Sequence, residues 1–155
     1  MKKVSIITVN FNHSHVTDAL LDSIGLKNTY QNIEIIVVDN GSVVNPIPAW
    51  QQKYPQVMFI RSDINTGFAG GNNIGINAAT GDYLFLVNND TEFTDKLIDK
   101  LVNTLNNNNK IAIVSPKINY YYQPGMLQYV GYTEMNYYTA RNSQIGQFEI
   151  DNGQY

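Results

Sequence analysis

Short runs of apolar, mostly β-branched residues recur along the chain, and polar turn residues follow each run. The runs do not alternate between apolar and polar positions, as strands with one solvated face do. The pattern therefore predicts central strands that are covered on both faces. The five runs are Val4–Val9, Ile33–Val38, Val57–Ile60, Tyr83–Val87 and Ile111–Val114.

Two segments between these runs have the spacing of amphipathic helices. Ser14 is placed to cap the first helix, Gly25 lies near its end, and Thr94 is placed to cap the second. The alternation of buried strands with helices predicts an open α/β sandwich with a mainly parallel sheet and right-handed crossovers. The apolar positions on one face are Val16, Ala19, Leu20 and Ile24 in the first helix, and Leu97, Ile98, Leu101, Val102 and Leu105 in the second.

The periodicity weakens after Ser115, where tyrosines cluster without a clear pattern. We expect the α/β core to occupy residues 1–115. Residues 116–155 would then begin a further region that is incomplete, so that the single domain is truncated at its C-terminus. The tyrosines have two open interpretations: rings that stack on sugars, or a partly exposed β region.

The composition narrows the class of protein. Hydrophobic residues make up 43% and charged residues 15%, which is typical of a globular protein. A net charge of −3, with no basic run beyond Lys2-Lys3, argues against nucleic acid as a partner. The absence of cysteine excludes disulfides, thiolate zinc sites and cysteine nucleophiles, and it fits a reducing compartment.

The N-terminal apolar run is too short for a signal peptide, and no run approaches the ~20 residues of a membrane helix. We therefore expect a cytoplasmic domain. Contact with the inner face of the membrane would come only through parts of a full-length protein outside this chain.

Polar side chains follow four of the predicted strands. Asn10–His13 follow the first, Asp39–Ser42 the second, Asp63–Asn73 the third, and Asn88-Asn89-Asp90 the fourth. Ligands of open parallel sheets bind outside the carboxyl ends of the strands. We therefore expect these segments to hold a polar, oxygen-rich ligand. Asp39 would bond a ribose or a base, although Asp-Asn-Gly is also a strong turn former.

The segment Asn65–Asn73 contains three glycines in five positions and opens a helix through Ile74 to Ala79. Glycines let a backbone approach a bulky ligand, and a helix N-terminus suits an anion. The spacing Gly67-x-x-Gly70-Gly71 matches neither the Walker lysine loop nor the dinucleotide fingerprint.

Asp90 is the carboxylate at the end of the fourth strand and is a candidate ligand for Mg²⁺ or Mn²⁺. These ions are held by one or two carboxylates together with phosphate oxygens and water. The alternative is that Asp90 is a turn residue before the Thr94 helix.

His13 and His15 lie two residues apart and could suggest a metal pair, but no third ligand lies nearby in the sequence. This favours the interpretation that they are exposed residues at the start of a helix.

Taken together, four blocks in this order resemble the family 2 glycosyltransferases, an inverting family with the GT-A (Rossmann-like) fold. The Gly-Phe-Ala-Gly-Gly-Asn block is most similar to the rhamnosyltransferase-like branch. The resemblance implies that residues 1–115 are a nucleotide-sugar-binding core and that residues 116–155 begin the acceptor side. The blocks are Val4–Asn12, Ile36–Ser42, Asn65–Gly75 and Gly81–Asp90.

The resemblance also implies roles for single residues in binding the donor. Asn88-Asn89-Asp90 occupies the place of the family's Asp-x-Asp motif, but Asn88 replaces its first carboxylate. Asn88 and Asn89 would contact the donor, Asn88 at a ribose hydroxyl, and Asp90 alone would hold the metal ion. The further donor-binding residues are Thr8 and Asn10 lining the pocket, Asp39 at the base or ribose, Asn65 and Gly67 beside the nucleoside, and Asn73 facing the pocket.

The implied reaction transfers a sugar from a UDP- or dTDP-sugar to a hydroxyl of a saccharide or lipid-linked saccharide, with inversion, in surface polysaccharide synthesis. A catalytic base must take the acceptor's proton. In the family this base lies far downstream, where Glu134, Glu149 and Asp151 stand in no recognisable motif. We therefore expect this chain to bind donor and to turn over slowly or not at all.

Three alternatives remain open. A non-catalytic nucleotide-sugar-binding or scaffold domain would fit the loss of one motif carboxylate. A nucleotidylyltransferase would need a basic glycine-rich loop after the first strand, where Asn10–His13 offers none. A carbohydrate-binding protein would depend only on the tyrosines.

Overall fold

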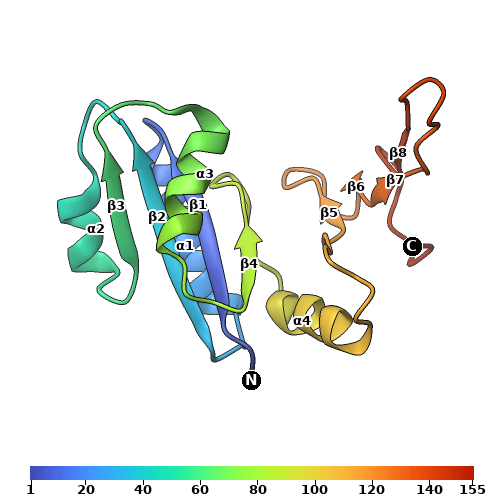
Figure 1. Ribbon diagram of the computed structural model, residues 1–155, viewed down its shortest axis with the longest axis horizontal. Helices are drawn as coiled ribbons and strands as arrows, with labels where there is room; N and C mark the ends of the chain where they lie inside the picture. Colours follow the sequence, from blue (N-terminus) through green and yellow to red (C-terminus); the bar gives the residue numbers. More distant parts are fainter. The chain divides into compact units, whose positions relative to one another are not determined.

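The structure is a computed structural model that describes residues 1–155, and it forms two compact units, Met1–Ile98 and Asp99–Tyr155. The first unit holds the sheet and three helices (Figure 1). The elements are β1 (Val4–Asn10), α1 (Ser14–Lys27), β2 (Ile33–Asn40), α2 (Ile47–Lys53), β3 (Met58–Ser62), α3 (Gly67–Ala78), β4 (Tyr83–Leu86), α4 (Leu97–Asn107), β5 (Ile118–Asn119), β6 (Leu127–Tyr129), β7 (Gly131–Tyr132) and β8 (Gln144–Ile145).

The main sheet has four parallel strands in the order β3-β2-β1-β4, and their arrowheads point the same way in Figure 1. This confirms the predicted α/β fold with a parallel sheet flanked by helices. β1 and β2 extend beyond the apolar runs to Asn10 and Asn40. In this register Asn10 pairs with Asp39, and Asp39 pairs with Arg61. Three polar side chains therefore form a row across the ends of three strands.

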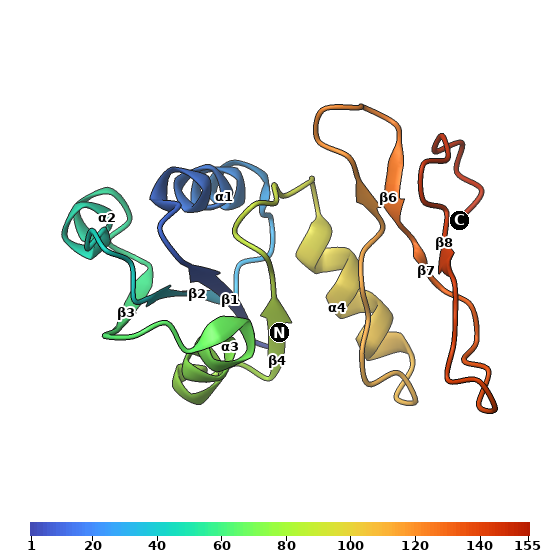
Figure 2. The ribbon, with the colours of Figure 1, turned by 90° about the horizontal axis from the view of Figure 1, so that it is seen from above.

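Helices cover both faces of the sheet: α1 and α2 lie on one side and α3 on the other (Figure 2). Successive side chains of a strand point to opposite faces. Asn10 bonds to α1, whereas Val9 packs against α3. On the α3 side, Ile7, Ile36 and Val38 form a fully buried cluster. The central strands β1 and β2 are apolar on both faces because both faces are covered. The prediction was wrong for the edge strand β4, where Leu84 and Leu86 are about half exposed.

Helix α1 is rotated from the predicted orientation. Its buried residues are Thr17, Leu20, Leu21 and Ile24, and Ala19 is exposed. Ser14 is the first helical residue rather than the cap, and the capping position is taken by His13 without a side-chain hydrogen bond. The sequence pattern missed Thr17 because a threonine does not count toward an apolar stripe.

One further prediction about an element was wrong, and one helix was missed. Ile111–Val114 forms no strand, and Ile113 is 88% exposed, because no neighbouring strand pairs with this segment. The short helix α2 was not predicted. It follows Pro46, and its buried Trp50 stacks on Phe59 at 5.4 Å between ring centroids.

The second unit contains most of α4 and two short antiparallel pairs, β5–β6 and β7–β8. Leu127 is fully buried, and its backbone bonds with Glu149 and Phe148. Tyr122, Tyr137 and Tyr138 are almost fully exposed. No helix of the chain is both long enough and apolar enough for a membrane span.

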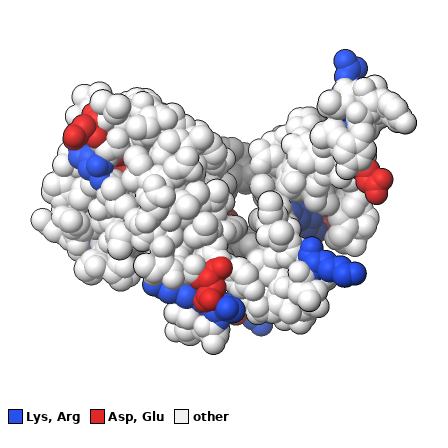
Figure 3. Space-filling view, in the orientation of Figure 1, with Lys and Arg blue, Asp and Glu red and all other residues white.

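Charged side chains pair across elements at the amino ends of the strands. In Figure 3 red and blue atoms lie side by side at the upper left and at the lower edge of the view. Glu34 on β2 accepts hydrogen bonds from Lys3 (2.7 Å), Ser5 (2.5 Å) and the backbone N–H of Thr80 (2.7 Å). Burial alone would raise the pKa of Glu34, but these bonds outweigh it and lower the pKa to about 2. The cluster therefore joins β1, β2 and the turn before β4.

Candidate functional site at the carboxyl edge of the sheet

The parallel topology brings the predicted strand-end segments to one edge of the first unit. Asn10 ends β1, Asp39 and Asn40 end β2, and the Asn88–Asp90 turn follows β4. β1 lies between β2 and β4 and hydrogen-bonds to both. These residues therefore share one edge, which we call the carboxyl edge.

Asp39 is the centre of a buried polar network. One carboxylate oxygen accepts hydrogen bonds from the Asn10 amide (2.9 Å) and the Ser42 hydroxyl (2.5 Å). The other oxygen pairs with the Arg61 guanidinium at 2.5 Å. Arg61 also donates to the Ser42 carbonyl at 2.9 Å. The Asp39 side chain is fully buried, so in this conformation its carboxylate is bonded to the protein and presents no surface to a base or ribose.

The network continues through α1 toward the turn after β4. The Thr17 hydroxyl donates to the Asn10 side-chain oxygen, and the Asn89 amide donates to the Thr17 hydroxyl, each at 3.1 Å. Side chains from β3, β2, β1 and α1 are thereby connected to the segment that carries Asp90. A fully bonded buried network makes the geometry of its members specific.

Asn40 organises the opposite face of the same edge. Its oxygen accepts from the backbone N–H and the hydroxyl of Thr66, and its amide donates to Asn65 and to the Gly67 carbonyl. The Asn65 oxygen also accepts from the Gly67 N–H at 2.8 Å. Asn40 therefore fixes the start of α3, and the amide nitrogen of Asn65 is the part of that side chain left for a ligand.

The glycines of α3 have two different roles. A methyl group added at Gly71 would lie 2.7 Å from a Val9 methyl, and one at Gly70 would lie 2.6 Å from Thr66. Gly70 and Gly71 therefore allow α3 to pack closely within the protein, a role we did not predict. Gly67 has a φ of +74°, with open space where a side chain would be. Of the three, Gly67 is the glycine with room for a ligand.

Two predicted donor-binding residues lie in opposite environments. Thr8 is fully buried, and its hydroxyl has no hydrogen-bond partner. Asn73 is exposed on α3, whereas the adjacent Asn72 is buried and donates to the Phe68 carbonyl. The network does not include Thr8 or Asn73, and their roles toward a ligand remain predictions.

Asn88 and Asp90 are exposed, and Asn89 between them is partly buried. The Asp90 carboxylate makes no hydrogen bond or ion pair with the protein, so it is open to a cation. No group of three or more His, Cys, Asp or Glu side chains could hold a metal ion by itself. The residues fit a site in which Asp90 is one ligand and the oxygens of a phosphorylated substrate complete the shell of Mg²⁺ or Mn²⁺.

A pocket of about 400 Å³ opens beside the network, within the usual size range of small-molecule sites. Its walls include Asn10, Asn12 and Ser42 from the carboxyl edge, and Trp50 and Lys53 from α2. The pocket therefore adjoins the residues that hold Asp39.

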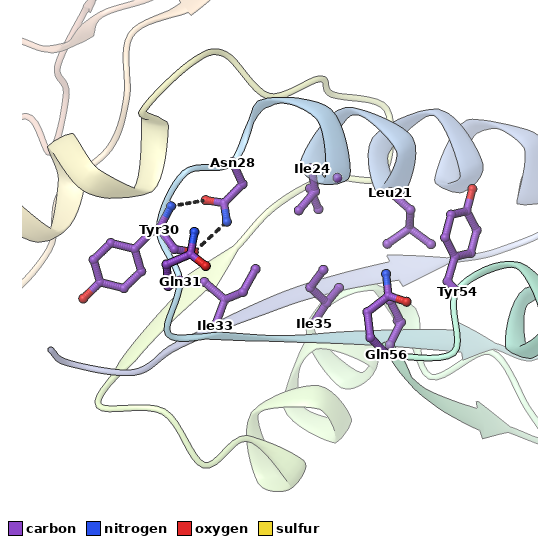
Figure 4. Close-up of a pocket in the computed structure, with 11 residues that line it drawn as sticks. Leu21, Ile24, Asn28, Tyr30, Gln31, Ile33, Ile35, Tyr54 and Gln56 are labelled. Carbon is purple, nitrogen blue, oxygen red and sulfur yellow. Dashed lines mark hydrogen bonds between the residues drawn. The ribbon is translucent and has the colours of Figure 1, made fainter.

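A second pocket, of about 250 Å³, lies between α1 and the first half of β2 (Figure 4). Leu21 and Ile24 of α1 face Ile33 and Ile35 of β2 across it. None of the predicted donor-binding residues lines this pocket, so it is separate from the carboxyl edge.

The sequence analysis missed three residues of the network: Thr17, Ser42 and Arg61. Arg61 directly follows the apolar residues Met58–Ile60 but is itself partly exposed, so nothing in the sequence indicated that it pairs with Asp39. Ser42 lay within a quoted block but was given no role. Thr17 had no signal, because its partners lie 7 and 72 positions away in the chain.

The candidate downstream bases lie in the second unit. Asp151 pairs with Lys117 at 2.6 Å, and this hydrogen bond lowers the pKa of Asp151. A lowered pKa weakens a carboxylate as a proton acceptor. Glu149 accepts a hydrogen bond from the Tyr155 hydroxyl, and Glu134 is exposed.

Solved structures similar to this chain share its fold. The chain resembles the crystal structure of S. aureus TarS 1-349 with a TM-score of 0.60 and 18% identity, covering 68% of this chain and 32% of that one. It also resembles the mannosyltransferase PcManGT from Pyrobaculum calidifontis in complex with GDP-Man and Mn²⁺. That match has a TM-score of 0.60 and 20% identity, and covers 67% of this chain and 32% of the other.

Sequence comparisons place the chain in a family. A protein named an uncharacterized glycosyltransferase from Haemophilus influenzae is 30% identical over 82% of this chain and 40% of its own length. Glycosyltransferase GlyG from Streptococcus pneumoniae is 32% identical over 61% of this chain and 33% of its own length. The chain thus spans well under half of these relatives. The model of the family described as Glycosyl transferase family 2 matches residues 5–152. With this match over almost all of its length, the chain belongs to glycosyltransferase family 2.

Proposed function

We propose that this domain binds a nucleoside-diphosphate sugar at the carboxyl edge and presents it for transfer to a hydroxyl group with inversion. The observation that carries the proposal is the contrast on this edge between a bonded, buried network and an exposed Asp90 without protein partners. The network gives the edge a fixed shape, and Asp90 supplies the free carboxylate. Ligand sites in open parallel sheets lie at such an edge.

The nucleoside would lie against the ends of β1 and β2, beside Gly67. Gly67 leaves open space there, and the unbonded amide nitrogen of Asn65 lies two residues before it. Asn10 and Ser42 line the adjoining pocket. Asp39 would act through these neighbours, because its own carboxylate is buried and already bonded.

The diphosphate would lie between the start of α3 and Asp90. The first N–H groups of a helix carry a partial positive charge that attracts phosphate. A divalent cation held by Asp90 and the diphosphate would neutralise the charge that develops on the leaving group. Asn88 lies two residues before Asp90, where its amide would bond a ribose hydroxyl without adding charge to the metal site.

In the transfer itself, the acceptor oxygen forms a bond to the anomeric carbon while the bond from that carbon to the diphosphate oxygen breaks. The electron pair leaves with the nucleoside diphosphate, and the acceptor's proton passes to a base.

The ion pair of Asp151 with Lys117 disfavours Asp151 as this base. We propose that the base is not supplied by this chain and that this chain alone releases nucleoside diphosphate slowly. We further propose that the donor is a UDP- or dTDP-sugar of the rhamnosyl or hexosyl class, and that the acceptor is a saccharide or lipid-linked saccharide in surface polysaccharide synthesis.

Calorimetric titration tests the donor site. UDP-glucose, dTDP-rhamnose and GDP-mannose are titrated into the chain in Mn²⁺ and in EDTA, the third because the similar mannosyltransferase is described with GDP-Man. We expect at least one donor to bind more tightly in Mn²⁺. Asp90→Ala should weaken binding in Mn²⁺ at least tenfold, as expected from the loss of a charged contact worth ~1.5–3 kcal/mol.

Asp63→Ala is the matched control, because Asp63 is an exposed carboxylate that follows β3 on the same sheet. Its affinity should stay within about twofold of wild type. If donor affinity were the same in Mn²⁺ and in EDTA, and the same in wild type and Asp90→Ala, the proposed metal site would be wrong. A chain that bound none of the three donors would contradict donor binding altogether.

A further inference from the structure

We propose that Thr17 of α1 is a positioning residue, which holds the Asn88–Asp90 turn in register with the Asn10–Asp39 network. As a statement about donor binding, the inference rests on the proposed function. As a statement about the order of the turn, it stands on contacts of the first unit alone.

Thr17 is the polar member of an otherwise apolar buried face. The other buried residues of α1 are Leu20, Leu21 and Ile24, and Thr17 is fully buried among them. A hydroxyl buried without partners is costly, and it has one proton to donate and lone pairs to accept. Thr17 uses both capacities, donating to Asn10 and accepting from Asn89. Its position is therefore specified by two polar partners from different elements.

The turn that Thr17 holds has few other attachments. The backbone pairing of β4 with β1 ends where the Val87 N–H donates to the Ile7 carbonyl at 3.0 Å. The next bond to another element is the Asn89 amide to Thr17, and the one after it is the Phe93 N–H to the Ser23 hydroxyl at 3.0 Å. Both anchors come from α1, so this helix sets the path of the segment that carries Asp90.

The two anchors differ in what they reach. Ser23 accepts from the Phe93 backbone and donates to the Leu20 carbonyl of its own helix. Thr17 instead bonds to Asn10, which itself donates to Asp39 and Ser42. Thr17 therefore links the turn to the network, whereas Ser23 anchors a point three residues beyond Asp90.

The geometry also leaves Asp90 free. Thr17 holds the neighbouring side chain, Asn89, and the Asp90 carboxylate keeps all its lone pairs for a ligand. A binding group is most effective when its supporting contacts fix it without occupying it. We infer that the bond from Asn89 to Thr17 sets the direction of the Asp90 carboxylate relative to Asn10 and Asp39.

Thr17→Val tests the inference, because valine keeps the shape of threonine and removes both hydrogen bonds. Thr17→Ser is the matched control, because it keeps the hydroxyl. Donor affinity is measured with UDP-glucose, dTDP-rhamnose and GDP-mannose in Mn²⁺ and in EDTA. We expect Thr17→Val to weaken binding in Mn²⁺ about tenfold and to change binding in EDTA by about twofold or less, with Thr17→Ser within about threefold of wild type in both.

A second readout does not depend on any ligand. The heteronuclear NOE of the Asn89 and Asp90 amides reports their order on the picosecond to nanosecond timescale. The NOE of these amides should be lower in Thr17→Val than in wild type and unchanged in Thr17→Ser. The measurement is made at temperatures where circular dichroism shows that wild type and both variants are folded. An unchanged NOE in Thr17→Val would overturn the inference, even if the wild-type chain bound no donor and the proposed function had failed.

The binding result separates the two hypotheses further. If Asp90→Ala lost the binding that depends on Mn²⁺ while Thr17→Val kept it, Thr17 would have no positioning role and the proposed function would stand. If Thr17→Val weakened binding equally in Mn²⁺ and in EDTA, its effect would be general to the fold, and the inference would again be wrong.

Discussion

Asp39 lies at the end of β2 and Asp90 follows β4 of the same parallel sheet, and the protein gives them opposite surroundings. Asp39 is fully buried and is bonded to Asn10, Ser42 and Arg61. Asp90 is exposed and has no bonded partner within the protein. The position at a strand end is shared, so position alone does not make a ligand-binding carboxylate. Burial and existing partners decide which of the two shapes the site and which remains free for a ligand.

The same substitution at the two positions is the strongest test of this comparison. Asp39→Asn should lower the free energy of unfolding by about 3 kcal/mol, because it leaves Arg61 without its counter-charge and gives Asn10 and Ser42 a poorer acceptor. The value lies at the low end for a buried pair because the Arg61 side chain is 31% exposed and can regain water. Urea unfolding measures the change.

Asp90→Asn is the control for that experiment. It should change the free energy of unfolding by less than about 0.5 kcal/mol, as expected for an exposed residue without contacts. Equal losses at the two positions would mean that the buried network has no special part in stability. The comparison would then be wrong.

Glu34 extends the comparison to the amino end of β2, where a carboxylate is bonded but serves no proposed ligand. Its pKa is lowered from 4.5 to about 2, although burial opposes this, because Lys3, Ser5 and Thr80 bond the charged form. The folded pKa is the lower one, so the stabilisation is present above pH 4.5 and is lost as the pH falls toward 2. Each unit of pKa corresponds to about 1.4 kcal/mol, which gives a total of about 3 to 4 kcal/mol.

Glu34→Gln measures this contribution directly. At pH 7 the variant should unfold with a free energy about 3 to 4 kcal/mol below wild type, and the two proteins should converge as the pH approaches 2. Taking the difference between the proteins removes the titration of the other carboxylates. A difference that stayed constant from pH 7 to pH 2 would rule out the assigned ionic role.

The smallest expected effect is a gain in stability at Thr8, which lies two residues before Asn10 on the same face of β1. Its hydroxyl is buried without a partner, unlike that of Thr17. Thr8→Val should raise the free energy of unfolding by about 1 kcal/mol, because it removes the cost of an unsatisfied polar group and keeps the shape. Thermal unfolding would reveal a stabilised protein. A lower stability would mean that the Thr8 hydroxyl has a partner after all.

Much of the fold was predictable because its signals are local. The apolar runs at β1 to β4 and the glycine block at the start of α3 were found in the correct order, and the ends of the strands differ by one or two residues. Strand ends are uncertain because Asn10 and Asn40 are polar yet remain in the ladder. The prediction of a strand at Ile111–Val114 was wrong for the opposite reason. An apolar segment forms a strand only where a partner strand is present, and this segment has none.

The edge on which the candidate site lies followed from the sequence, since parallel strands bring their carboxyl ends together. The sequence alone therefore identified the candidate residues at this edge, which are Asn10, Asp39, Asn65, Gly67 and Asp90. It did not show which of them are bonded within the protein and which are free for a ligand. Only the register of Asp39 with Arg61, and the orientation of Thr17 toward Asn10 and Asn89, decided which groups are bonded to each other. Hydrophobic periodicity and turn preferences act between near neighbours in the chain, whereas the pairing of buried polar groups depends on distances between elements that only the packed fold sets.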